Sequence, residues 1–306
     1  ALPAHAGWVL TSHRRADARE VDATHLATIA RGRLEQAVPV TPEPHAQSGR
    51  ATTISGAVRA RSQARAPRGR RSLIRLDRAA VYRGGRSVIG TFDWTLVEGE
   101  HWYVRGANGA GKSTLLMLLY GDLWPGHGAT LERRWSPVED WKRRVGLVSP
   151  ELQARYAATG CTVRDIVASG LHDSIGLNEV ATASESRRAA RELSRWGLRE
   201  LTDRSARELS YGQLRLVLVA RAFVRRRRLY LFDEPFDGLD ADARQRLRAR
   251  LDTAVLEEDA TLVIASHHVD DVPAFVNREL TLRRGRAPAA GIRPAARPRT
   301  RSRRRP

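Results

Sequence analysis

Residues 106–114 read Gly-Ala-Asn-Gly-Ala-Gly-Lys-Ser-Thr and match the phosphate-loop pattern G-x-x-x-x-G-K-S/T at every position. Apolar runs at residues 101–104 and 115–120 flank this stretch, so we expect a strand before the loop and a helix after it. Glycines let backbone N–H groups surround a polyphosphate, and the helix N-terminus adds a favourable dipole; the alternative is an ordinary glycine-rich turn. We expect Lys112 to reach the outer phosphates and Ser113 to bind Mg²⁺. The predicted nucleotide-binding residues of the loop are Gly106, Asn108, Gly109, Ala110, Gly111, Lys112, Ser113 and Thr114.

Length and cysteine content limit the class of protein. The 306 residues are enough for one large domain or two small ones. The single cysteine, Cys161, excludes a disulfide framework and a cysteine-rich metal site, and it favours a reducing, cytoplasmic setting. No apolar run approaches the ~20 residues that cross a bilayer, and the first residues do not have the pattern of a signal peptide. The sequence begins at Ala1 without a methionine, as a fragment of a longer chain would.

The formal charge of +19 suggests nucleic acid as a partner, but its distribution argues against a basic binding face. Residues 73–282 carry only +2, whereas residues 39–72 carry +6 and residues 283–306 carry +10. The chain has 51 arginines and two lysines, Lys112 and Lys142, and a codon bias towards arginine explains this excess. A lysine is therefore notable inside the phosphate loop, where a compact point charge fits better than a planar guanidinium.

Composition divides the chain into four parts. Residues 39–72 are rich in Pro, Ala, Ser, Gly and Arg and show no hydrophobic periodicity, so we expect a disordered linker. Residues 73–286 alternate predicted strands and helices, with a helical segment at about 160–205 that predicts a separate lobe. Residues 287–306 are predicted to be a disordered, arginine-rich tail. The run of four arginines at 225–228 is explained as a solvated turn at a helix end.

The first 38 residues resemble the end of the main domain. Residues 7–11 form a strand-like run followed by Ser12-His13, and residues 261–265 form another followed by Ser266-His267. An Arg-Gly-Arg triplet follows in both places, at 31–33 and 284–286. We therefore interpret residues 1–38 as the C-terminal remnant of an earlier copy of the domain, the alternative being a chance resemblance.

A second candidate site lies at the end of an apolar strand, residues 229–232. Asp233 and Glu234 follow this strand directly, and ligands of open α/β sheets bind at the carboxyl ends of the strands. Asp233 is therefore expected to hold Mg²⁺ opposite the phosphate loop, and Glu234 to act as the general base that activates water. The alternative is a strand that ends in two solvated acids.

Two further groups could contact phosphate. Ser210, Gly212 and Gln213 lie at the start of a predicted helix, where a second anion site could form, although a helix capped by serine explains the same residues. His267 follows the last predicted strand, and its imidazole could hydrogen-bond a terminal phosphate. A histidine after a strand is also common as a structural residue.

Taken in order, these motifs resemble those of the ABC (ATP-binding cassette) ATPases over residues 73–286. The match is to the Walker A loop at 106–114, the signature at 209–213 with Tyr211 where glycine is usual, Walker B and the catalytic glutamate at 229–234, the D-loop at 237–240 and the switch histidine His267. The resemblance implies an α/β fold: a P-loop NTPase nucleotide-binding domain of ABC type, with an antiparallel β subdomain and a helical subdomain. It also implies ATP and Mg²⁺ as cofactors, and hydrolysis of ATP to ADP and phosphate.

Two positions depart from the family pattern. Pro150 lies where the family has a glutamine, and Gln153, three residues later, is the candidate that replaces it as a Mg²⁺ ligand. The family also stacks adenine on an aromatic residue of an early hairpin. Tyr82 is the candidate here, and Arg83 is the alternative because a guanidinium also stacks on a base.

The sequences of residues 149–153, 210–216 and 266–273 resemble those of the tandem-cassette ABC proteins of the molybdenum-transport or photorepair type. This resemblance implies a cassette that pairs with a second cassette, in the same chain or in a homodimer, and drives a membrane permease, with molybdate as the implied substrate. The alternative is a soluble ABC ATPase that acts in nucleic-acid repair or translation. The implied location is the cytoplasm, or the inner face of the cell membrane as a peripheral protein.

Overall fold

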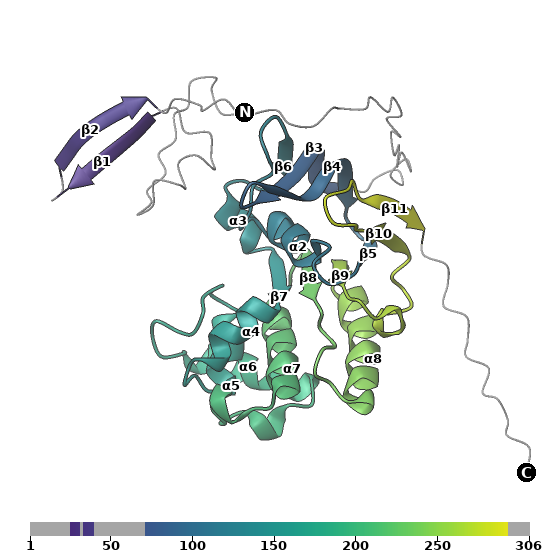
Figure 1. Ribbon diagram of the computed structural model, residues 1–306. Helices are drawn as coiled ribbons and strands as arrows, with labels where there is room; N and C mark the ends of the chain where they lie inside the picture. The colour runs from purple at the N-terminus through teal and green to yellow at the C-terminus, as the bar shows by residue number, and fades with distance from the viewer. Residues whose placement is uncertain (1–24, 31–32, 40–70, 293–306) are drawn as a thin grey trace, which may run out of the picture. The chain divides into compact units, whose positions relative to one another are not determined.

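The computed structural model describes residues 25–30, 33–39 and 71–292, and its chain divides into two compact units, residues 1–59 and 60–306. In the first unit, β1 (His25–Ala30) and β2 (Arg33–Pro39) pair as an antiparallel hairpin with a register shift between Thr28 and Ile29 (Figure 1). The strand-like run at residues 7–11 and His13 lie outside the described residues. The linker was predicted at 39–72, but β2 includes Pro39 and the first strand of the second unit begins at Ser72, so the segment between these strands is 40–71.

A six-stranded sheet runs through the second unit in the order β11-β10-β5-β9-β8-β7. Strands β7 to β10 and β5 are parallel, and β11 joins β10 antiparallel at one edge. Strands β8 and β9 are buried at every residue, which explains their continuous apolar sequences. The bounds are β5 (His101–Arg105), β7 (Val145–Val148), β8 (Leu229–Asp233), β9 (Thr261–Ala265), β10 (Arg278–Thr281) and β11 (Ala289–Ile292).

A separate antiparallel sheet, β4-β3-β6, packs over α2 (Lys112–Tyr120). Its strands are β3 (Ser72–Arg83), β4 (Arg86–Val97) and β6 (Thr130–Arg133). Trp94 of β4 meets Trp102 of β5 edge to face at 5.2 Å between ring centroids, so the two sheets share one core. The predicted antiparallel β subdomain is this sheet, and it holds the helix that follows the phosphate loop.

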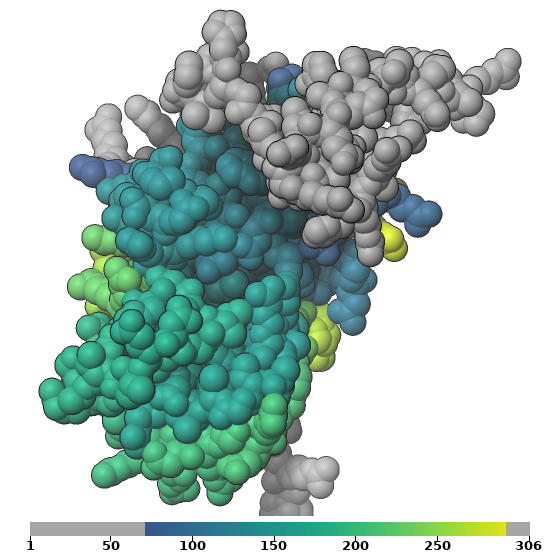
Figure 2. Space-filling model, turned by 90° about the vertical axis from the view of Figure 1, so that its left-hand side faces the viewer, coloured from purple at the N-terminus to yellow at the C-terminus, as the bar shows by residue number. Residues whose placement is uncertain are grey.

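The predicted helical subdomain is confirmed as a lobe built from α4 (Pro150–Ala157), α5 (Val163–Ser169) and α6 (Ala183–Arg195), packed on α7 (Tyr211–Phe223). Figure 2 shows this lobe, in teal to green, below the bluer residues around α2 and β6. Thr162 and Thr182 cap α5 and α6 by accepting the backbone N–H of Asp165 and Glu185. The remaining α-helices of the described chain are α3 (Val138–Lys142) and α8 (Ala241–Glu257). None of the described helices has the length and hydrophobicity that a membrane span requires.

Helix α4 starts earlier than the sequence predicts, because Pro150, which the sequence indicates as the end of a strand, is also the first residue of a helix. Ser149 is the N-cap and its Oγ accepts the backbone N–H of Leu152 at 3.1 Å. Proline is favoured at the first helical position, since its fixed φ suits the helix and its missing N–H has no partner there. The helical lobe therefore begins near residue 150 and not near 160.

The predicted disorder from residue 287 onward is wrong for its first residues, because Ala289–Ile292 form strand β11. These residues pair antiparallel with β10, from Thr281 opposite Ala289 to Arg278 opposite Ile292. Gly285, at φ 68°, provides the left-handed residue of the connecting turn. The open edge of β10 offers unpaired backbone groups, and pairing satisfies them whatever the side chains are. Residues 293–306 lie outside the described residues.

The arginine run at 225–228 is not simply a solvated turn, because Arg227 is buried between the lobe and the sheet. Its guanidinium donates to Arg143 O at 2.5 Å, to Gly170 O at 2.7 Å and to Asp173 Oδ1 at 2.7 Å. Gly170 and Asp173 belong to the lobe, whereas Arg143 precedes β7. Arg227 therefore joins the helical lobe to the sheet.

We expect Arg227→Ala to lower the free energy of unfolding by about 3–5 kcal/mol, because it removes the buried partner of Asp173 and of two carbonyl groups and leaves Asp173 only the exposed Arg225. Arg225→Ala is the matched control. Its guanidinium lies 3.8 Å from the same carboxylate but is 43% exposed, so we expect a loss below about 1 kcal/mol. Urea unfolding followed by circular dichroism measures both, and equal losses would contradict this role of Arg227.

Candidate nucleotide-binding and catalytic site

The phosphate loop connects the end of β5 to the start of α2. Gly109 and Gly111 have φ values of 76° and 102°, which only glycine adopts at low cost. The helix has no side-chain cap at its N-terminus, so its first N–H groups remain available to an anion. Lys112 folds back over the loop and donates from Nζ to Gly106 O at 3.0 Å. The loop thus has the geometry of a phosphate cradle before any ligand arrives.

The ends of β8 and β9 bring the predicted catalytic residues to this loop. Glu234 Oε1 lies 3.2 Å from Lys112 Nζ, and Glu234 Oε2 lies 3.0 Å from His267 Nδ1 and accepts the backbone N–H of His267 at 3.2 Å. Glu234 has φ 48°, a left-handed conformation that is costly for a residue with a side chain. The sequence placed these three residues far apart along the chain, and the parallel sheet joins them at one edge.

Ser113 and Asp233 are the pair that fits a magnesium ion. The Ser113 side chain hydrogen-bonds the Asp233 carboxylate, whereas Asp233 Oδ1 is buried with no hydrogen-bond partner among the described residues. Burial raises the pKa of Asp233, and the neighbouring Glu234 raises it further, while Ser113 and Lys112 lower it. A hydroxyl and a buried carboxylate oxygen without a partner are the donors that Mg²⁺ prefers.

Gln153, the other predicted metal ligand, is engaged elsewhere. It lies in α4, is 2% exposed, and donates from Nε2 to Tyr211 O at 2.9 Å. Its Oε1 is buried with no hydrogen-bond partner in the described chain. The structure thus joins Gln153 to the start of α7, and its role as a metal ligand stays a prediction.

The signature residues form the N-terminus of α7. Ser210 Oγ accepts Gln213 N at 3.2 Å, and Gln213 Oε1 accepts Ser210 N at 2.9 Å, so the two residues form a capping box. A Cβ on Gly212 would lie 2.6 Å from Gly238 O, which explains the glycine there by close packing. Ser210 and Gln213 thus cap α7 within this chain, and their contact with a phosphate stays a prediction.

The two candidates for stacking on adenine point to different neighbours. Tyr82 is 56% exposed, and its ring packs against Gly126, whose added Cβ would lie 2.8 Å from Tyr82 Cε2. Arg83 reaches Met117 of α2, with 3.6 Å between Nη2 and Sδ. Arg83 is thus the residue in contact with the helix that begins at Lys112, and both residues stay candidates.

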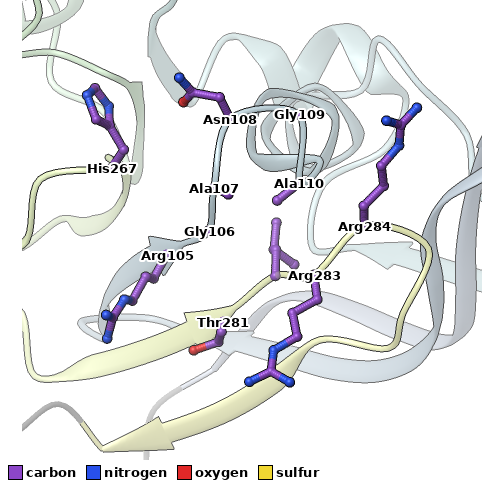
Figure 3. Close-up of a pocket in the computed structure, with 11 residues that line it drawn as sticks. Arg105, Gly106, Ala107, Asn108, Gly109, Ala110, His267, Thr281, Arg283 and Arg284 are labelled. Atoms are coloured by element: carbon purple, nitrogen blue, oxygen red, sulfur yellow. The ribbon is translucent and has the colours of Figure 1, made fainter.

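A cavity of about 730 Å³ lies beside the loop. Figure 3 shows Asn108 and Gly109 along its upper side, His267 at one flank, and Arg283 and Arg284 pointing away from each other. These arginines have no local signal in a chain that contains 51 arginines, and only the fold brings them to the loop. The residues that line the cavity are Arg105, Gly106, Ala107, Asn108, Gly109, Ala110, His267, Thr281, Leu282, Arg283 and Arg284.

Comparisons with known proteins found relatives that match about two thirds of this chain. A sequence model described as ABC transporter matches residues 89–237. The chain is 36% identical over 212 residues to the ABC transporter ATP-binding protein ModF of Escherichia coli (strain K12), a match that covers 67% of this chain and 43% of ModF. The cobalt import ATP-binding protein CbiO of Rhodobacter capsulatus is 33% identical over 217 residues, covering 69% of this chain and 75% of CbiO. This chain thus spans less than half of ModF and three quarters of CbiO.

Solved structures share the fold. CbiO1 of Clostridium perfringens, part of the ABC transporter complex CbiONQ, superposes with a TM-score of 0.60 at 24% identity and covers 72% of this chain and 88% of its own. A dimeric bacterial ABC transporter cassette gives a TM-score of 0.62 at 18% identity, covering 73% of this chain and all of its own. At these identities the likeness concerns the fold, which confirms the predicted α/β cassette with its antiparallel and helical subdomains.

Proposed function

This chain belongs to the family of ABC transporter ATP-binding proteins, and we propose that, as an ATPase of that family, it uses ATP-driven pairing of two cassettes to energise a membrane transporter. One observation carries this proposal most strongly. Glu234 joins the other two residues: its Oε1 lies 3.2 Å from Lys112 Nζ and its Oε2 lies 3.0 Å from His267 Nδ1, beside the start of a helix that has no side-chain cap. Such a cluster serves transfer of a phosphoryl group to water, which requires positioning, charge neutralisation and a base.

Each residue then has a separate task. Lys112 binds the outer phosphates of ATP, and Glu234 accepts the proton of the attacking water. His267 hydrogen-bonds Glu234 Oε2 and fixes the direction of that carboxylate. Ser113 and Asp233 would hold Mg²⁺, which supplies neutralisation of the phosphate charge when it is bound. Tyr82 or Arg83 covers the adenine in this proposal.

In this proposal the signature residues contact the ATP that is bound to a partner cassette. Only one phosphate-binding helix start is needed for one ATP, and α2 provides it, so the N-terminus of α7 is left for a second ATP held by another cassette. Tyr211 is 53% exposed at this helix start, which supports a surface that is open to a partner. Closing of the pair on ATP and reopening after hydrolysis is the switch that a transporter would use.

The partner is either a second copy of this chain or a cassette that precedes it in a longer chain. The tandem arrangement is supported by the match to less than half of ModF and by the hairpin β1–β2, whose sequence repeats the Arg-Gly-Arg triplet found between β10 and β11. In this proposal residues 1–39 are the end of that first cassette, residues 40–71 are the linker and residues 293–306 the tail. The protein works in the cytoplasm at a membrane permease, with molybdate as the substrate to test first. Residues 73–282 carry only +2, which argues against nucleic acid as the partner.

We expect Ser210→Asp to prevent pairing without preventing ATP binding. Aspartate caps a helix as well as serine does, so the α7 start is kept, but its charge repels the partner's phosphates. Juxtaposed like charges cost several kcal/mol, so we expect pairing to weaken at least about tenfold. Light scattering of the Glu234→Gln variant with ATP and Mg²⁺ measures the pairing, and a fluorescent ATP analogue measures the binding.

Ser210→Asn is the matched control, since it caps the helix without the charge and should still pair. If the Ser210→Asp variant paired as strongly as the Ser210→Asn variant, the result would contradict the proposal that the signature faces the partner's ATP. Loss of ATP binding by Ser210→Asp would instead place the signature in the chain's own site.

A further inference from the structure

Two residues tied to unusual positions of the family motifs, Tyr211 and Gln153, contact each other in the structure. Tyr211 stands where the signature usually has glycine, and Gln153 follows Pro150, which stands where a glutamine is usual. Gln153 Nε2 donates to Tyr211 O at 2.9 Å, although the two residues are 58 positions apart. One hydrogen bond thus joins the first helix of the lobe, α4, to the first residue of α7.

The Tyr211 side chain is fixed on two further sides. Arg215 Nη2 donates to the Tyr211 hydroxyl at 2.7 Å, and the guanidinium lies 5.3 Å from the ring centroid. On the other side, the ring lies on the D-loop: a Cβ on Gly238 would be 2.3 Å from Tyr211 Cδ1. A glycine in place of Tyr211 could make neither contact. The ring is nonetheless 53% exposed at the helix start, so it is both fixed and accessible.

Arg215 links Tyr211 to Asp233 in the interior. It is fully buried, and Nη1 donates to Asp233 O at 3.4 Å, while Nε has no hydrogen-bond partner among the described residues. A buried guanidinium is costly unless its surroundings compensate the charge. The Asp233 carboxylate and the Tyr211 ring and hydroxyl are the compensating groups around it. Removal of the Tyr211 hydroxyl therefore leaves a buried cation that must seek another partner close to the Mg²⁺-binding carboxylate.

We propose that Tyr211 and Arg215 are positioning residues that couple the signature surface to the metal-binding residue Asp233. The proposal rests on the proposed function, in which Ser113 and Asp233 hold Mg²⁺ and the signature faces a partner. A nucleotide or partner that presses on the exposed Tyr211 ring shifts its hydroxyl, Arg215 follows, and the backbone of Asp233 is held or released. The signature thereby acts on the hydrolytic site of its own cassette as well as on the partner's ATP.

The first test is Tyr211→Phe, which keeps the ring on Gly238 and removes only the hydroxyl. Residues that hold a metal ligand in place typically change metal affinity or activity 10–100-fold when altered. We therefore expect kcat to fall about tenfold and the affinity for Mn²⁺, measured by electron paramagnetic resonance in the presence of AMP-PNP, to fall by about the same factor. Affinity for AMP-PNP without metal should stay within about twofold, because Lys112 and the loop are unchanged.

Tyr156→Phe is the matched control, because Tyr156 OH accepts Arg221 Nε at 3.0 Å in the interior of the helical lobe. It removes a tyrosine hydroxyl beside a buried arginine far along the chain from Asp233. We expect it to lower thermal stability and to leave Mn²⁺ affinity unchanged. Similar Mn²⁺ affinities for Tyr211→Phe and Tyr156→Phe would overturn the proposal.

A double-mutant cycle with Arg215→Met completes the test. If Tyr211 and Arg215 act on Asp233 together, the double variant should bind Mn²⁺ no more weakly than the single variant with the lower affinity. Losses of Mn²⁺ affinity that multiply in the double variant would show independent effects and would overturn the proposal. Arg215→Lys, which keeps a charged donor, should recover part of the affinity. If Arg215→Met does not fold, Tyr211→Phe against its control still decides. A wild-type chain that neither binds AMP-PNP nor hydrolyses ATP would refute the proposed function, whereas an active chain with a normal Tyr211→Phe variant would refute only this inference.

Discussion

Replacement of Glu234 by glutamine is expected to reduce ATP turnover at least about a hundredfold while ATP stays bound, since a general base contributes 10²–10⁴-fold. Glutamine keeps the shape of the side chain and one oxygen, which can accept a hydrogen bond either from Lys112 or from the His267 backbone. It cannot accept the proton of the attacking water. The variant should therefore close on ATP and remain closed, which light scattering detects as a stable pair.

The control for this experiment is Glu151→Gln, at a glutamate of α4 that is paired with Arg155 on the surface. We expect its turnover to equal that of the unaltered chain. Phosphate release measured at saturating ATP compares the variants. Unchanged turnover of Glu234→Gln would exclude Glu234 as the base, even if ATP binding were confirmed.

The second large effect is expected from Lys112→Met. Lys112 is 6% exposed and stands between Gly106 O and Glu234, where its ammonium group can turn to the phosphates. Charge-assisted hydrogen bonds contribute about 1.5–3 kcal/mol each, so loss of two of them weakens ATP binding about a hundredfold or more. Methionine matches the length of the side chain, so the expected loss comes from the charge. Titration with a fluorescent ATP analogue measures it.

Lys142→Met is the control that the sequence itself offers, because Lys142 is the other lysine of the chain. Its Nζ lies 2.6 Å from Asp122 Oδ1 and 5.0 Å from the Tyr120 ring centroid, on a side chain that is 30% exposed. We expect unchanged ATP affinity and a loss of stability below about 1 kcal/mol. Equal ATP affinity of Lys112→Met and Lys142→Met would contradict a phosphate site at this loop.

The parts of the site that could be predicted from sequence are those with local signals. The loop at 106–114 has its own pattern, and Glu234 and His267 each follow a continuous apolar run. Parallel strands place their carboxyl ends at one edge, so two runs and one loop suffice to predict that these residues meet. The rule predicts that Glu234 and His267 lie close together, but it does not predict the hydrogen bond between them.

Other features depend on contacts between residues far apart in sequence, for which no local pattern exists. Arg227 resembles its three arginine neighbours in sequence, and it is distinguished by its burial and by its hydrogen bonds to Gly170 and Asp173, more than 50 positions earlier. The bond from Gln153 to Tyr211 is of the same kind. Strand β11 was not predicted for a different reason. Small residues in an arginine-rich segment predict disorder, whereas the unpaired backbone groups at the edge of β10 favour pairing with another strand.

The left-handed backbone of Glu234 has a consequence for how this chain responds to selection. A residue with a side chain at φ 48° costs on the order of 1–3 kcal/mol, a sizeable part of the margin by which a domain is folded. Glycine at this position would relieve that cost and remove the carboxylate. Screens that reward heat resistance alone should therefore enrich inactive chains at residue 234, whereas screens that also require turnover should retain glutamate there and find their stabilising changes elsewhere.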